Sequence, residues 1–112
     1  MAKSKSIKIP EDVKEAVIER VITFNKAHKS QFQVEFKGKF CYLSKVHNTF
    51  WGKSVETKLG RLTWTGDIDK WTFDVFKYSR EVYDPNEFMF PGREDLDGTI
   101  EGAMQAGFKL YP

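Results

Sequence analysis

The side chains on the two sides of a turn at residues 66–69 match one another in order, and this symmetry predicts an antiparallel hairpin over residues 59–76. The fold-back pairs Trp64 with Trp71, Leu62 with Phe73 and Gly60 with Val75 on one face, and Thr65 with Lys70, Thr63 with Thr72 and Arg61 with Asp74 on the other. Because successive side chains of a strand point to opposite faces, a slip of one residue would mix the two sets. The pattern therefore predicts the hairpin and its register, with an apolar core face and an outer face that is polar near the turn.

A second hairpin is predicted at residues 31–46, where apolar and polar residues alternate on either side of a tight turn at Gly38 and Lys39. Glycine at the first turn position suits a two-residue hairpin turn. The turn would pair Phe36 with Cys41 and Val34 with Leu43 on the core face, and Lys37 with Phe40 and Glu35 with Tyr42 on the outer face. Together the two hairpins predict a four-stranded antiparallel sheet.

One helix is predicted before the hairpins and one after them. The first begins near Pro10, whose φ angle suits the first helical position, and the second follows Asp97 or Thr99, either of which can cap it. Apolar residues at three- and four-residue spacing give each helix one buried face: Val13, Ala16, Val17, Val21 and Phe24 in the first, and Ile100, Ala103, Met104, Gly107, Phe108 and Tyr111 in the second. The predicted fold class is α+β, with both helices packed on one face of the sheet.

Two segments without periodicity are predicted to be loops, residues 47–57 and residues 82–96. Phe50 and Trp51 in the first loop are expected to fold back as a lid over the edge of the core, although such a pair can also line a pocket. Around the second loop lie the acidic residues Asp84, Glu87, Glu94, Asp95 and Asp97. Their spacing differs from that of a calcium-binding loop, so turn formation and helix capping explain them better than a metal site does.

Length and composition predict one soluble domain. Of the 112 residues, we expect 1–8 to be a flexible basic N-terminus and 9–112 to be a single α+β domain. The single cysteine excludes an intrachain disulfide and fits a reducing compartment. No apolar stretch resembles a signal sequence or approaches the roughly 18 residues of a membrane span. We therefore expect a cytoplasmic protein that is not bound to membranes.

Few residues have the chemistry of a nucleophile or a general base. Cys41 lies in a predicted strand, which favours an inert buried thiol. His28 falls at the end of the first helix and His47 at the start of the first loop, and neither belongs to a catalytic motif. Phosphate-binding glycine motifs are also absent from the sequence. We expect no catalytic residue, no metal site and no cofactor.

The most suggestive surface of the predicted fold is aromatic and basic. Phe40 and Tyr42 of one hairpin, and Phe76 and Tyr78 of the other, are predicted to lie on the outer face of the sheet. The expected interaction surface consists of Lys37, Lys39, Phe40, Tyr42, Phe50, Trp51, Phe76 and Tyr78. Because exposed apolar patches usually mark an interface, we expect a non-enzymatic protein-interaction domain, homodimeric through its aromatic outer face.

Two alternative functions remain open. Rings on an open sheet beside lysines can stack nucleobases, so the first alternative is a single-stranded nucleic-acid-binding module. The second is a small enzyme with a pocket under residues 47–57, in which His47 would act with an acidic residue of the long loop.

The C-terminal part of the chain carries a distinctive pattern. Residues 77–79 read KYS, residues 83–92 read YDPNEFMFPG, residues 97–107 read DGTIEGAMQAG, and the chain ends in YP. In this pattern the chain, from Gly38 onward, resembles a small family of uncharacterised bacterial proteins. The resemblance implies a dedicated bacterial domain, but it implies no activity and assigns no role to any residue.

Overall fold

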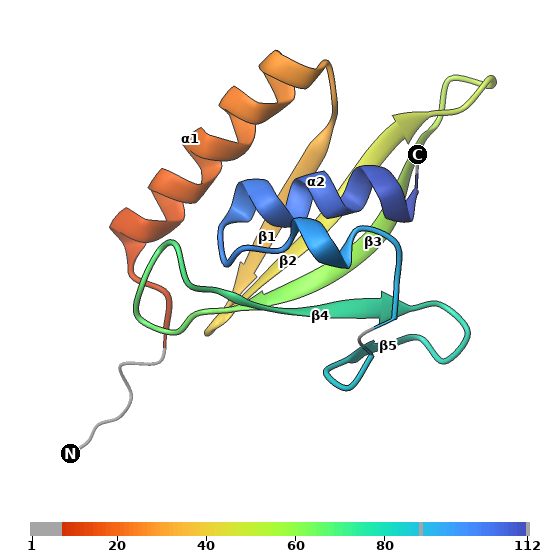
Figure 1. The fold of residues 1–112 in the computed structure, drawn as a ribbon. Helices are drawn as coiled ribbons and strands as arrows, with labels where there is room; N and C mark the ends of the chain where they lie inside the picture. The colour runs from red at the N-terminus through yellow and green to blue at the C-terminus, as the bar shows by residue number, and fades with distance from the viewer. Residues whose placement is uncertain (1–7, 88, 112) are drawn as a thin grey trace.

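The computed structural model describes residues 8–87 and 89–111 (Figure 1). The expected flexible N-terminus lies outside the described residues, apart from Lys8. In chain order the elements are α1 (Glu11–His28), β1 (Phe32–Lys37), β2 (Phe40–Asn48), β3 (Ser54–Thr63), β4 (Thr72–Lys77), β5 (Val82–Asp84), η2 (Arg93–Asp95) and α2 (Ile100–Leu110). The chain forms an antiparallel sheet with one helix before it and one after it in the sequence, and this confirms the predicted α+β class.

Both predicted hairpins are present in the predicted register. β3 pairs with β4 through Gly60–Val75, Arg61–Asp74, Leu62–Phe73 and Thr63–Thr72. β1 pairs with β2 through, among others, Val34–Leu43, Glu35–Tyr42, Phe36–Cys41 and Lys37–Phe40. Beyond the last pair of β3 and β4, the rings of Trp64 and Trp71 still lie 5.2 Å apart between centroids. The side-chain alternation therefore predicted both registers correctly.

The prediction of four strands is wrong, because the sheet has five strands in the order β1-β2-β3-β4-β5. The fifth strand, β5, lies in the segment that was expected to be a loop and pairs antiparallel with the end of β4. Its three residues are too few to show a period of two. The turn that follows β4 returns the chain alongside that strand, and this tertiary pairing makes the segment a strand.

The prediction that residues 47–57 form a loop is also wrong. β2 continues to Asn48 and β3 begins at Ser54, so the turn is confined to residues 49–53. Leu59 is an extra residue in β3 that has no partner in β2, which makes a β-bulge. Because of the extra residue, the alternation of inward and outward side chains changes phase at the bulge. The apolar–polar alternation therefore does not run through the whole strand, and the sequence does not reveal it.

Beyond the bulge, the ends of β2 and β3 form a two-stranded ribbon, which we call the arm (residues 46–56). Its last pairs are Val46–Glu56, His47–Val55 and Asn48–Ser54. In the described chain, the pairing of β1 ends opposite Lys45, and that of β4 ends opposite Gly60. The arm therefore extends from the body of the sheet and past the C-terminal end of α2 (Figure 1).

Both helices pack on the core face of the sheet. Most residues of the predicted apolar stripes lie in the core, in which Val17, Val21 and Phe24 of α1 and Ile100, Ala103 and Met104 of α2 join Cys41, Leu43 and Leu62 of the sheet. Tyr111 was predicted on the buried face of the second helix, but it follows the end of α2 and is 37% exposed. Thr99 is the residue that caps α2, since its hydroxyl accepts the Gly102 N–H at 2.9 Å. The packing confirms that both helices lie on one face.

Two features hold α2 in place. A methyl group on Gly107 would lie 2.9 Å from the side chains of both Leu59 and Phe32, so glycine lets the helix approach the sheet closely. Arg20 of α1 makes two 2.8 Å bonds to the carboxylate of Glu101 in α2 and a 3.0 Å bond to Asp69. Both carboxylates raise the pKa of Arg20, and the hydrogen bonds to Glu101 are the largest cause.

Candidate functional site

A row of five aromatic rings crosses the outer face of the sheet, and we call it the ring row. Its members, in spatial order, are Phe40, Tyr42, Tyr83, Phe76 and Tyr78. The ring centroids are 6.0 Å apart for the first pair, then 5.2, 4.8 and 4.7 Å. Four of these rings were predicted from the sequence. The fifth, Tyr83, joins the two hairpins and was missed because it belongs to β5.

Cations of the same chain cover part of the ring row. The guanidinium of Arg61 lies 4.5 Å from the ring centre of Phe40 and 5.3 Å from that of Tyr83. The ammonium groups of Lys39 and Lys58 lie 5.4 Å from the Phe40 ring and 5.1 Å from the Phe76 ring. Phe76 is only 8% exposed, whereas Tyr78 is 47% exposed. Cationic side chains of the same chain therefore cover much of the aromatic outer face of the sheet.

A polar groove of about 270 Å³ lies beside the ring row. It is lined by Glu35, Lys37, Tyr42, Ser44, Glu56, Lys58 and Tyr83. Glu56 accepts hydrogen bonds from the Ser44 hydroxyl at 2.6 Å and from the Gln33 amide at 2.9 Å, and these bonds lower its pKa. Burial raises the pKa of Tyr83. Of the predicted interaction residues, Lys37 and Tyr42 line this groove, and the groove carries charges of both signs.

The tip of the arm exposes two large rings far more than the ring row does. Phe50 is 89% exposed and Trp51 is 83% exposed, with 5.3 Å between their ring centroids. The lid that was expected over the core is therefore wrong. The turn itself is ordered by backbone bonds, from Thr49 N–H to the Lys53 carbonyl at 2.7 Å and from Gly52 N–H to the Thr49 carbonyl at 3.0 Å. The arm thus presents a defined aromatic tip.

An apolar groove of about 320 Å³ lies where β4 ends, and we call it the end groove. Its apolar lining includes Tyr78, Met89, Phe90, Pro91, Leu110 and Tyr111. Met89 is 88% exposed at its rim. The ring of Tyr111 lies 6.3 Å from that of Tyr78, so the groove continues from the end of the ring row.

The described residues do not bring the candidate catalytic groups together. The ring of His28 stacks on Phe24 at 4.0 Å, and its Nδ1 lies 3.0 Å from the Phe24 carbonyl. His47 lines a shallow groove with Lys45, Thr57, Leu110 and Tyr111, and this lining includes no carboxylate. The pocket that was expected under residues 47–57 is replaced by the arm. This geometry removes the pairing of His47 with an acid on which the enzyme alternative depends.

Cys41 is predicted to be unreactive in the folded protein. Its side chain is 0% exposed, and burial raises its pKa to about 12 from 9.0. Because the thiolate is the nucleophile, we expect alkylation by iodoacetamide to be about 1,000-fold slower in the native state than in urea, since only the small unfolded fraction reacts. Labelling that is stopped at intervals and followed by mass measurement tests this, and similar rates in both states would contradict it.

The buried thiol also makes stability depend on pH. In the unfolded chain the thiol loses its proton near pH 9, whereas in the folded protein it keeps the proton until its pKa of about 12. The contribution of the neutral thiol to the free energy of unfolding is therefore present below pH 9 and is lost as the pH rises from 9 to 12.

The acidic residues of the long loop have structural partners. Asp84 pairs with Arg80, Glu87 with Lys77, and both Glu94 and Asp95 with Lys109. Asp97 accepts bonds from the amide and hydroxyl of Thr99 at 3.0 and 2.5 Å, and the hydroxyl bond is the main cause of its lowered pKa. Within residues 8–87 and 89–111, no three His, Cys, Asp or Glu side chains are grouped to hold a metal ion.

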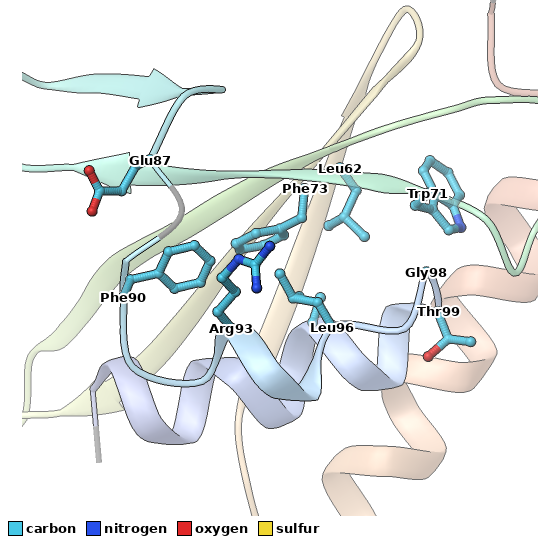
Figure 2. Close-up of a pocket in the computed structure, with 10 residues that line it drawn as sticks. Leu62, Trp71, Phe73, Glu87, Phe90, Arg93, Leu96, Gly98 and Thr99 are labelled. Atoms are coloured by element: carbon cyan, nitrogen blue, oxygen red, sulfur yellow. The ribbon is translucent and has the colours of Figure 1, made fainter.

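A cleft of about 330 Å³ opens between the sheet and the segment that leads into α2 (Figure 2). The lining is mainly apolar and aromatic, with Leu62, Trp71, Phe73, Phe90, Leu96 and Ala103. The remaining lining residues are Glu87, Arg93, Gly98 and Thr99. Sequence reasoning did not predict this cleft, since its walls come from β3, β4, the loop, η2 and α2.

No protein-family model, curated protein or solved structure matches this chain. The resemblance of the C-terminal pattern to a bacterial family therefore stays a prediction. In the described part of the chain, no helix has both the length and the apolar character needed to cross a membrane.

Proposed function

We propose that this chain is a non-enzymatic interaction domain that forms a two-fold dimer by exchanging arms. The observation that carries the proposal is the exposure of Phe50 and Trp51, at 89% and 83%. Exposed aromatic pairs are costly to leave in water and typical of interface centres. The arm tip supports this role better than the ring row, because Tyr83 and Arg61 already cover much of that row.

The receiving surface is the end groove of the second copy. The groove and the arm tip are complementary in chemistry, since most of the side chains that line the groove, beside Lys77 and Ser79, are apolar and the tip is an apolar projection. In a two-fold dimer each copy inserts its own tip and receives that of its partner, so both contacts form twice.

The two arm tips supply a large part of the area that a specific dimer buries. A buried aromatic side chain removes about 150–250 Å² from water, so two rings remove about 300–500 Å². The two tips of the dimer together remove about 600–1,000 Å² from water, whereas a standard interface buries about 1,600 Å² in total. A one-sided contact would bury half as much, which favours mutual exchange.

The test is the dimer dissociation constant, measured by analytical ultracentrifugation of the wild type and the double variant Phe50→Ser/Trp51→Ser. We expect dimerisation to weaken at least about 100-fold, because each central aromatic typically contributes about 2 kcal/mol or more. The control is Ile22→Ser, which removes an exposed apolar side chain from α1, where Ile22 is 49% exposed. It should leave the dissociation constant unchanged.

A groove variant tests which surface receives the arm. Met89→Lys places a charge at the rim of the end groove and should weaken dimerisation with the arm intact. A mixture of the arm variant and the groove variant should form heterodimers, since one wild-type tip still meets one wild-type groove. A monomeric wild type at high concentration, or a dimer insensitive to the arm variant, would overturn the proposal.

A further inference from the structure

We propose that the cleft between β4 and η2 is a binding site for a small aromatic carboxylate of one or two fused rings. The cleft shares Phe90 with the end groove but none of its other lining residues, and the inference does not depend on dimerisation. It follows from the depth, the walls and the charge of the cleft.

The floor of the cleft is buried and apolar. Leu62, Trp71 and Ala103 are 2%, 6% and 1% exposed and belong to the hydrophobic core, so the base of the cleft is continuous with that core. The volume of about 330 Å³ falls at the lower end of the range for small-molecule sites, about 300–1,000 Å³. A cavity of about 150 Å³ holds benzene, so this cleft suits one or two fused rings.

The side walls favour a flat ring. Phe73 and Phe90 face the cleft from the sheet and from the loop, with 6.1 Å between ring centroids and 40° between planes. Figure 2 shows these two rings and Leu96 converging on the same space. Aromatic groups pack on such rings in offset or edge-on arrangements, which add to the gain from burial.

The polar groups of the lining favour a negative charge on the ligand. The carboxylate of Glu87 lies 3.4 Å from Lys77, the Trp71 indole N–H donates to the Ile68 carbonyl at 2.9 Å, and Thr99 caps α2. These groups are therefore committed to the protein. Arg93 is the cation among the residues that line the cleft, and in Figure 2 its side chain extends from η2 toward the sheet.

A guanidinium can bind a carboxylate while keeping other contacts. It presents five N–H donors in a planar fork, two of which match the two oxygens of a carboxylate. Arg93 can therefore retain the interactions that it already makes and still bind an anion at the cleft. A ligand with its ring on the apolar floor and its carboxylate at Arg93 uses both the apolar and the cationic part of the lining.

The experiment compares two probes of nearly the same shape, 2-naphthoate and neutral 2-naphthalenemethanol. Binding is followed by amide and indole N–H chemical shifts in NMR spectra of the full chain. We expect saturable shifts at the Trp71 indole and at Gly98, Thr99 and Ala103. The carboxylate should bind about 10-fold or more tightly than the alcohol, the size expected for a charge-assisted hydrogen bond.

Two variants separate the charge from the cavity. Arg93→Gln should abolish the preference for the carboxylate, whereas the control Lys109→Gln, which removes a cation paired with Glu94 outside the lining, should keep it. Leu96→Trp should weaken both probes by filling the cleft. Thermal unfolding checks that each variant is folded. If Leu96→Trp does not fold, the preference of Arg93→Gln for the carboxylate over the alcohol decides the test. Shifts confined to other surfaces, the absence of saturable binding, or an unchanged preference in Arg93→Gln would overturn the proposal.

Discussion

Replacing Met104 by alanine is expected to lower the free energy of unfolding by about 2–5 kcal/mol, the usual cost of truncating a fully buried methionine. Met104 is 0% exposed and lies in the core between α2 and the sheet. The substitution removes three heavy atoms from a site where neighbours on both layers are held by secondary structure, so the cavity cannot close fully. A domain of typical stability would lose a large part of its margin. Urea unfolding followed by tryptophan fluorescence measures the change.

The chain contains a matched control for this substitution. Met89 is 88% exposed, and Met89→Ala should change the free energy of unfolding by less than about 0.5 kcal/mol, as expected at a surface position. Equal losses for the two methionines would show that α2 does not pack as described. The same measurement of both variants therefore tests the position of α2 over the sheet.

Replacing Gly92 by alanine is expected to cost about 2–5 kcal/mol for two additive reasons. Gly92 has a φ of +94°, a conformation that costs a residue with a Cβ about 1–2 kcal/mol. Its Cβ would also lie 2.6 Å from the carbonyl oxygen of Ala106 and 2.8 Å from the Cα of that residue. Such overpacking adds about 1–3 kcal/mol, because the backbone of α2 cannot move aside as a flexible side chain would. The readout is again the free energy of unfolding.

Gly52 separates the two contributions. Its φ is +81°, but a Cβ at this position would have no atom within 4 Å. Gly52→Ala should therefore show the conformational cost alone, about 1–2 kcal/mol. If Gly92→Ala costs no more than Gly52→Ala, the close approach of the loop to α2 is wrong.

The parts of the fold that the sequence predicted are those with one face in the core and one in water. In the hairpins, the alternation around Leu43 and Leu62 follows from this difference, so pattern and register are linked. The helical stripes through Val17 and Met104 follow from the same contrast. The sequence also predicted four rings of the ring row, but it predicted Phe50 and Trp51 to be a lid over the core and not the tip of an arm.

The parts of the fold that the sequence did not predict lack this contrast between one face in the core and one face in water. In the arm both faces meet water, and the bulge at Leu59 interrupts the period, so residues 47–57 resemble a loop. β5 is too short to carry a pattern and depends on the edge of β4 for its hydrogen bonds. The cleft takes its walls from five separate segments, and no residue spacing within one segment predicts its contact with the others.

The sequence by itself determined the two hairpins with their registers, the two amphipathic helices and the α+β class, because each of these depends on a periodicity of neighbouring residues. Only the tertiary structure decided where the remaining aromatic residues lie. It placed Tyr83 among the ring row and held Phe50 and Trp51 out in water on the arm. It also closed the cleft around Arg93. The physical reason is that these positions depend on contacts between segments far apart in the chain, and no local spacing carries that information.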